Sequence, residues 1–255
     1  MNHDVREALA RARADRPELG ATIALQLDLV AEPRATRIDV DFAERAAARM
    51  AAGLPAIDPV TLRLDWEAFA RRLGEVAEIV ASHKPSLAAA AREAAEQATT
   101  RRSVQFFLDG GPVDALAAFL LTHALRPFLR PFVEAALATA EAARWSGGFC
   151  PACGGAPDFA VLEADAGARR LLCGRCDAEW AHARTGCPFC GNQDRETLGY
   201  FGTGEAAHRL YVCDRCNRYL KTLDLRATWR RPSLPAERVL AVGMDLAAAR
   251  AGYHA

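Results

Sequence analysis

The spacing of apolar residues in the first 145 residues predicts a helical region. Between Trp66 and Ser82 apolar side chains recur at the i, i+3, i+4 and i+7 positions of one helix face, and Asp65 stands where an N-cap is expected. Ser86 can cap a second, alanine-rich helix. Together these patterns predict the following helices: near 3–14, 17–31 and 39–52, Trp66–Ser82, Leu87–Ala98, about Val113–Leu125, and a last one that ends near Arg144 after an interruption or kink at Pro127 and Pro131.

The pattern changes near Trp145, where glycine, cysteine and proline replace the alanine-rich periodicity. Two pairs of short strand-like runs follow, Phe159–Leu162 with Arg169–Leu172 and Thr197–Phe201 with His208–Val212. A closing helix is expected from about Pro235 to Ala251. We therefore predict a multidomain α+β protein with four parts: an all-α helical bundle over 1–146, two small cysteine-rich modules over 147–186 and 187–226, and a C-terminal helical segment over 227–255.

Charge and apolar run length exclude several classes of protein. Lys and Arg total 32 and Asp and Glu total 32, so the formal net charge is zero. The stretch 150–226 is equally balanced, and metal-bound thiolates make it negative, which argues against a nucleic-acid partner. The best apolar run, Val113–Leu125, contains Asp114 and His123 and falls short of the about 20 residues of a membrane span. The first residues lack the apolar core of a signal peptide, so we expect a cytoplasmic protein without membrane insertion.

All eight cysteines fall between residues 150 and 216, in four Cys-x-x-Cys pairs. Two intervening residues let both sulfurs of a tight turn face one ion, and two such turns supply a tetrahedral set of four thiolates. Thiolate is a soft ligand that favours zinc or iron. The spacing therefore predicts two metal ions per chain, held by Cys150, Cys153, Cys173, Cys176, Cys187, Cys190, Cys213 and Cys216.

An internal repeat indicates how the pairs combine. Cys-Pro-Ala-Cys-Gly at 150–154 matches Cys-Pro-Phe-Cys-Gly at 187–191, and each copy continues through a hairpin-like insert to a second pair. The glycine after the second cysteine permits a positive φ. Each copy thus reads as a rubredoxin-like or zinc-ribbon module that holds one ion with its own four cysteines. A cross-braced arrangement, which joins the first pair to the third and the second to the fourth, is the alternative.

The other conspicuous side chains favour structural roles. His83 is expected at a helix end, and His123 lies in an apolar helix as a core histidine would. Aromatic residues at helical spacing are expected in the core; these are Trp66, Phe69, Phe106, Phe107, Phe128 and Phe132.

No residue pattern predicts catalysis, so we expect a non-enzymatic protein. A thiol–disulfide oxidoreductase normally uses one reactive pair at a helix start of a thioredoxin-like fold, and the chain has no such βαβ pattern. A catalytic zinc keeps an open position for water, which four cysteines per ion do not leave. The simplest interpretation is that the cysteines hold structural metal ions, which stabilise modules too small to have much of a hydrophobic core.

The residues around the cysteines also match a family pattern. Cys-Pro-x-Cys-Gly is followed by Leu-x-Cys-x-x-Cys-x-x-Glu-Trp, which ends at Trp180, and then by Arg184. The fourth pair leads into Tyr219-Leu220-Lys221, and the closing helix carries Asp245-Leu246 before Gly252-Tyr253. Over 150–255 the chain resembles the formate dehydrogenase accessory protein family FdhE, while its helical part matches only in kind.

The resemblance implies a maturation factor that binds the catalytic subunit of respiratory formate dehydrogenase in the cytoplasm and carries rubredoxin-type iron on its cysteine pairs. Trp180 and Tyr219 then pack beside the cysteine turns or contact the partner, and Arg184 and Lys221 can offset the negative charge of a thiolate set. Two alternatives stay open: a zinc-ribbon interaction protein of another complex, and a rubredoxin-like electron carrier.

Overall fold

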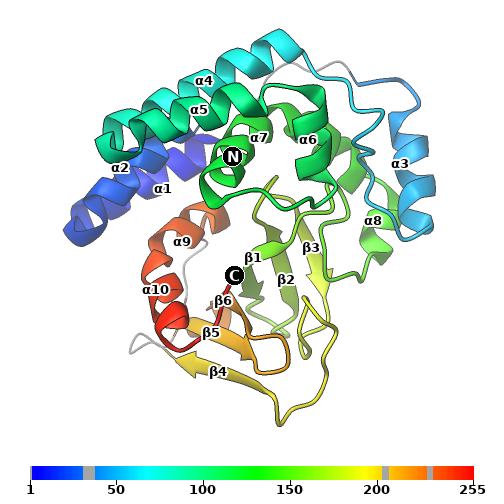
Figure 1. The fold of residues 1–255 in the computed structure, drawn as a ribbon. Coiled ribbons are helices and arrows are strands. Elements are labelled where there is room, and N and C mark those ends of the chain that lie inside the picture. Colours follow the sequence, from blue (N-terminus) through cyan, green and yellow to red (C-terminus); the bar gives the residue numbers. More distant parts are fainter. Residues whose placement is uncertain (1, 31–37, 203–206, 229–231) are drawn as a thin grey trace.

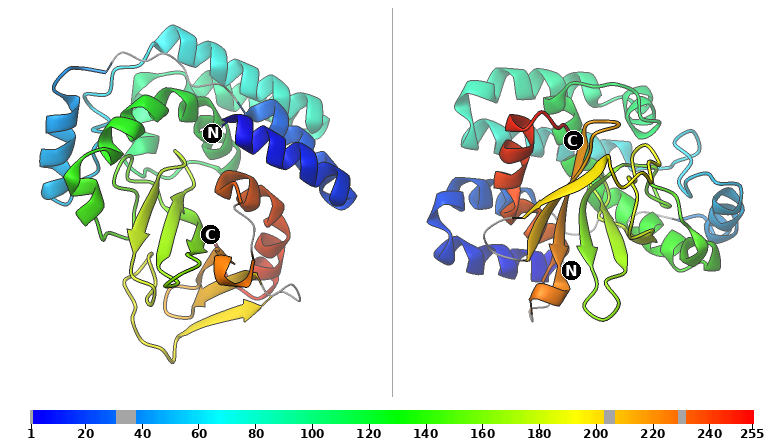
Figure 2. Two further views of the ribbon diagram at one scale, coloured as in Figure 1. Left: turned by 180° about the vertical axis from the view of Figure 1, so that it is seen from behind. Right: turned by 90° about the horizontal axis from the view of Figure 1, so that it is seen from below.

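The computed structural model describes residues 2–30, 38–202, 207–228 and 232–255. The helices that precede the β-sheet in the chain lie at one end of the molecule and the sheet at the other, and the two last helices lie beside the sheet (Figure 1, Figure 2). Before the sheet come α1 (Asn2–Asp15), α2 (Gly20–Leu29), α3 (Phe42–Ala51), α4 (Trp66–His83), α5 (Ala88–Ala98), α6 (Arg101–Leu108), α7 (Ala115–Leu137) and α8 (Ala140–Arg144). The predicted mixture of helix and sheet is confirmed. Residue 31, the last of the predicted helix near 17–31, lies outside the described residues.

Polar side chains begin several of these helices. Asp65 caps α4 as predicted, by accepting the N–H of Ala68 at 2.9 Å. Asp114 caps α7 in the same way and accepts two N–H groups of the first turn, which have no partner within the helix. Ser86, however, is not a cap. It lies inside a 3-10 turn that the preceding proline starts, and α5 begins only at Ala88.

Helix α7 is continuous over 23 residues, so the predicted end near Leu125 was wrong. Pro127 and Pro131 each remove a backbone donor, but both are accommodated inside the helix. The helix packs against α4 and α5 and buries a long apolar face that includes Phe128, and this burial offsets the lost hydrogen bonds. Although α7 is long and apolar, no helix among the described residues meets the requirements for crossing a membrane.

The closing helix is divided in two, against the prediction of one helix over Pro235–Ala251. The first half is α9 (Leu234–Leu240) and the second is α10 (Val242–Arg250). α9 contacts α1 and α2, whereas α10 contacts strand β6 (Arg218–Asp224). The break at Ala241 lets each half bury its apolar side chains in a different core.

Six strands form one sheet in the order β3-β2-β1-β6-β5-β4. Each sequence repeat supplies three antiparallel strands, and parallel pairing of β1 with β6 joins the two repeats. Both predicted strand pairs are present, but the third strand of each repeat was missed. The bounds are β1 (Pro157–Leu162), β2 (Arg169–Cys173), β3 (Glu179–His182), β4 (Leu198–Gly202), β5 (His208–Cys213) and β6 (Arg218–Asp224).

The largest hydrophobic core continues from the helices into the sheet. It contains side chains of α4 and α7 together with Ala160, Leu171 and Trp180 of the sheet. Phe159 precedes Ala160 on β1, and Leu172 follows Leu171 on β2. Because successive side chains of a strand point to opposite faces of the sheet, Phe159 and Leu172 belong to a different core, which lies under α10. The domain boundaries after residues 146, 186 and 226 stay a prediction. The largest hydrophobic core extends across the first boundary, and the β-sheet extends across the second.

Four of the six aromatic residues predicted for the core are buried. Phe69, Phe107, Phe128 and Phe132 are between 0% and 7% exposed. Trp66 is half-buried and packs against the same core. Phe106 is 49% exposed, because the face of α6 that carries it points to solvent.

The two singled-out histidines have structural partners. His83 ends α4, as expected, and its Nε2 lies 2.7 Å from Asp28 Oδ2 of α2. His123 is half-buried and stacks on Phe119, with ring centroids 4.4 Å apart. Burial and the nearby Arg126 lower the pKa of His123 well below its ordinary value, which favours the neutral ring.

Candidate metal centres

The four Cys-x-x-Cys turns share one backbone conformation. The residue after the second cysteine has a positive φ in each turn: Gly154 (72°), Asp177 (60°), Gly191 (71°) and Asn217 (53°). In the first turn this brings the N–H of Gly154 within 2.9 Å of the Cys150 carbonyl oxygen. Sequence reasoning anticipated the glycines but missed Asp177 and Asn217, although Asp and Asn are the residue types that tolerate this conformation best after glycine.

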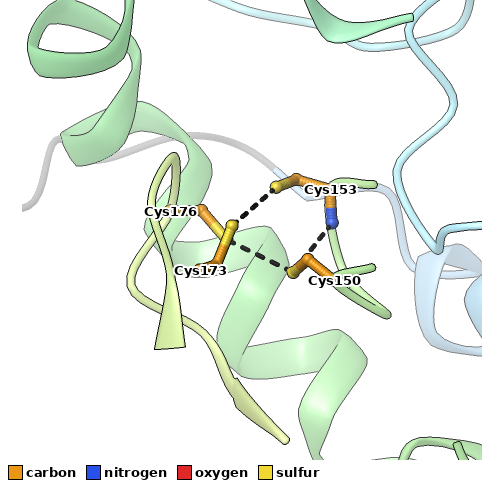
Figure 3. Close-up of side chains that lie close together, drawn as sticks. All are labelled: Cys150, Cys153, Cys173 and Cys176. Atoms are coloured by element: carbon orange, nitrogen blue, oxygen red, sulfur yellow. Dashed lines mark hydrogen bonds between the residues drawn. The ribbon is translucent and has the colours of Figure 1, made fainter. Parts of the chain in front are cut away.

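The first set of cysteines lies where the helices meet the sheet. Cys150 Sγ lies 3.6 Å from Cys176 Sγ, and Cys153 Sγ lies 3.6 Å from Cys173 Sγ. Figure 3 shows two turns that face each other with the four sulfurs between them. All four side chains are buried. The structure thus brings together the four residues predicted for the first site.

The second set repeats this geometry nearer the surface. Cys187 Sγ lies 3.7 Å from Cys216 Sγ, and Cys190 Sγ lies 3.7 Å from Cys213 Sγ. Cys187 and Cys213 are buried, Cys216 is half-buried and Cys190 is exposed. Because each set comes from one repeat, the cross-braced arrangement does not occur.

Both sets fit a tetrahedral metal ion. With a metal–sulfur distance of about 2.3 Å, neighbouring sulfurs of a regular tetrahedron lie about 3.8 Å apart. The paired sulfurs at 3.6 and 3.7 Å agree with this value, and all ligand atoms of a set lie within 4.8 Å of one another. A disulfide would need about 2.05 Å. Each set could therefore bind one metal ion, and its chemistry suits zinc and iron alike.

The thiols need a cation to ionise together. Burial raises the pKa of Cys150 and Cys176 well above the ordinary value, and it raises the pKa of Cys187 to about 12. Burial also opposes ionisation of Cys213, but hydrogen bonds from backbone N–H groups and from the Asn192 amide outweigh it and lower the pKa to about 7. A bound metal ion supplies the positive charge that makes four thiolates stable at one point.

Hydrogen bonds fasten the first set to the helical region. The N–H groups of Ala56 and Ile57 donate to the first cysteine turn at 2.8 and 2.9 Å. Arg175, inside the second turn, donates to the carbonyls of Phe107 and Leu108 at the end of α6, and its guanidinium lies over the Phe107 ring. The first site therefore holds together segments that are far apart in the sequence.

A charged cluster beside the first set was not foreseen from the sequence. Asp177 lies 2.9 Å from Arg238 of α9 and 3.1 Å from Arg126 of α7. Arg238 also lies 3.4 Å from Asp158 and donates to the Cys173 carbonyl. This cluster links α7, α9 and the second cysteine turn. Its members are separated by 19 to 112 residues in the sequence, so no local pattern marks them.

Two residues of the family pattern tie the sheet to α10. Lys221 Nζ donates to Asp245 Oδ2 at 2.9 Å, and the Tyr219 hydroxyl donates to Asp245 Oδ1 at 2.8 Å. Burial and the Asp245 carboxylate raise the pKa of Tyr219. Lys221 therefore neutralises a carboxylate instead of a thiolate set, contrary to the expectation for it.

The other two residues of the pattern differ in exposure. Trp180 is buried, and its Nε1 donates to the Gly147 carbonyl at 2.9 Å, so it packs beside the first cysteine turns as expected. Arg184 is exposed and lines a cavity beside the second set.

The fold and the cysteine region both have known relatives. The crystal structure of the FdhE protein from Pseudomonas aeruginosa matches with a TM-score of 0.65 over 99% of this chain and 91% of that one, at 21% sequence identity, which shows a common fold. The family described as "FdhE, central domain" matches residues 149–184, which hold the first cysteine set. A protein FdhE homolog from Rhizobium meliloti is 31% identical over 94% of this chain and 81% of its own length. The chain belongs to the FdhE family.

Relatives in the FdhE family differ in how much of their length is shared. A protein FdhE homolog from Aquifex aeolicus is 34% identical over 155 residues. That match includes 59% of this chain and spans about half, 53%, of the relative. The resemblance to FdhE seen in the sequence is confirmed.

Proposed function

We propose that this chain is a maturation factor for respiratory formate dehydrogenase, which binds the catalytic subunit in the cytoplasm before export. Membership of the FdhE family carries the proposal, because the Rhizobium meliloti homolog aligns with 94% of the chain. In this proposal the four-cysteine sets hold two ions of rubredoxin-type iron, with zinc as the other ion their chemistry suits. The boundaries predicted from the sequence divide the chain into a helical domain, two metal modules and a C-terminal segment.

The site geometry supports a binding role over a catalytic one. A tetrahedral ion with four cysteine ligands has no position left for water or substrate, so Lewis-acid chemistry of the hydrolytic kind is not expected at either set. The first set is buried inside the fold, whereas the second set reaches the surface through Cys190. The outer strand β4 beside it exposes Tyr200 and Phe201 by 56% and 51%. Exposed aromatic side chains of this kind are common in protein-binding surfaces.

Deleting the gene should abolish respiratory formate oxidation while the catalytic subunit is still synthesised. The chain with an affinity tag should restore the activity and co-purify with the catalytic subunit. Cys190→Ser should lose both properties, because loss of the second ion disorders the exposed module. Arg102→Gln, an exposed substitution on α6, is the matched control and should behave like the unchanged protein.

Two results would contradict the proposal. One is full formate oxidation in the deletion strain. The other is a metal-depleted Cys190→Ser variant that still binds the subunit and restores activity, since the second module would then be dispensable.

An electron carrier is the second candidate, and the partial exposure of the second set favours it. Electron transfer requires that the redox centre come close to its partner, and Cys190 is the exposed ligand position. A reversible couple that passes electrons to a defined acceptor, in a strain whose formate dehydrogenase matures without this protein, would favour the carrier over the maturation factor.

A further inference from the structure

A cavity of about 220 Å³ lies beside the second cysteine set, at the junction of the two repeats. Strands β4, β5 and β6 and the loop that carries Cys187 form most of its lining. The first repeat contributes two arginines, Arg169 from β2 and Arg184 from the segment after β3. The cavity therefore depends on the way the two repeats join.

Four guanidinium groups line this cavity, from Arg169, Arg184, Arg195 and Arg218. None of the described lining residues is Asp or Glu. Many other arginines in the described part of the chain have a carboxylate partner, as Arg209 does in Asp224 at 2.8 Å. Within the described ranges, none of the four cavity arginines has a carboxylate within ion-pair distance, so their charge is free to meet an anion.

Arg169 is a buried arginine of this cavity, and one hydrogen bond holds its guanidinium group. Arg169 is 4% exposed, and its Nη1 donates to the Gly186 carbonyl at 3.0 Å, while its Nε has no hydrogen-bond partner among the described residues. Its guanidinium lies 5.0 Å from the centre of the Tyr211 ring, which holds it in place. A buried donor without a partner is rare and calls for an explanation.

Arg218, on the second repeat, is half-buried and shares two of these features. Its guanidinium lies 3.8 Å from the centre of the Phe189 ring, and its Nε is buried without a hydrogen-bond partner in the described part of the chain. Two guanidiniums that are held against aromatic rings thus line one cavity. Guanidinium groups present their donors in a planar fork that matches the oxygens of carboxylate and phosphate.

The charge balance decides between these two anions. Four thiolates around a divalent ion carry two negative charges, and the cavity arginines carry four positive ones, so two positive charges remain. A phosphate monoester carries about −1.5 to −2 at neutral pH, whereas a carboxylate carries −1. We propose that this cavity binds a phosphate group, either as free phosphate or at the end of a small ester whose organic part packs on the aromatic rings. This site is independent of the partner proposed above.

Isothermal titration of the metal-loaded full chain with inorganic phosphate and with phenyl phosphate tests this site. Binding of either probe supports it. Equal affinities mean that the phosphate alone is recognised, and tighter phenyl phosphate means that an ester is preferred. The double variant Arg184→Gln/Arg195→Gln removes the two exposed arginines and should weaken binding by about tenfold or more. The control Arg102→Gln/Arg250→Gln removes two exposed charges elsewhere and should bind like the unchanged protein.

Three outcomes would overturn the proposal. The first is that neither probe binds. The second is that the double variant and its control bind equally well. The third is that benzoate, a monoanion with the same ring, binds as tightly as phenyl phosphate. Metal content is measured on each variant to separate loss of the cavity from loss of the second module. Weaker phosphate binding is assigned to the cavity only in a variant that keeps both metal ions.

Discussion

Cys153→Ser should release one metal ion per chain and unfold most of the molecule, whereas Cys190→Ser should release one ion and leave the helical region folded. Both substitutions replace a thiolate by a neutral hydroxyl, which is a poor ligand for zinc or iron. They differ in what surrounds the site. Cys153 is 4% exposed within the core shared by helices and sheet, while Cys190 is at the surface.

The size of the expected effect follows from metal energetics. Binding at a structural four-cysteine site contributes about 10–16 kcal/mol of apparent free energy. The net stability of a whole domain is only about 5–15 kcal/mol. Loss of the first ion therefore removes a free energy as large as the net stability of the fold. It also releases the contacts that Arg175 makes with α6.

Metal analysis together with far-UV circular dichroism checks this prediction. Cys190→Ser should keep most of its helical signal, and Cys153→Ser should lose most of it. If the two variants keep equal helical signal and melt at the same temperature, the first site does not hold the helices to the sheet as described.

Arg238→Met should lower the free energy of unfolding by about 3 kcal/mol, the low end of the range for breaking a buried ion pair. The side chains of Arg238 and Asp177 are each only 11% exposed. Without the guanidinium, Asp158 and the Cys173 carbonyl lose a partner, and Asp177 keeps only Arg126.

Urea unfolding of the metal-loaded variant measures this loss. Arg250→Met is the matched control, because Arg250 is exposed on α10 and its loss should change stability by less than about 0.5 kcal/mol. A cost for Arg238→Met no larger than that of the control would mean that the cluster of Arg126, Asp158, Asp177 and Arg238 contributes nothing to the docking of α9.

The grouping of the cysteines could be predicted because it is encoded locally. Two residues between cysteines fix a tight turn, and the repeat fixes which turns belong together. The positive φ values at Gly154 and Gly191 follow from the same local reasoning. The difference in burial between the two sets could not be predicted from the sequence. The burial of Cys153 and the exposure of Cys190 depend on which distant segments pack over each set.

Features that arise from distant segments were missed for the same reason. The parallel pairing of β1 with β6 joins residues about 60 positions apart, as Phe159 opposite Lys221, and leaves no local signal. The continuity of α7 through Pro127 is decided by packing against α4 and α5, which overrides the local preference of proline. Lys221 was expected to balance a thiolate set and instead pairs with Asp245, whose helix α10 lies beside β6.

We expect each of the two cysteine sets to hold one metal ion in a tetrahedron of four sulfurs. Elemental analysis of the full chain, purified without oxygen and combined with X-ray absorption at the edge of the metal found, measures both the count and the ligands. We predict two ions per chain with only sulfur neighbours at about 2.3 Å. One ion per chain, none, or a shell that contains nitrogen or oxygen ligands would contradict the claim.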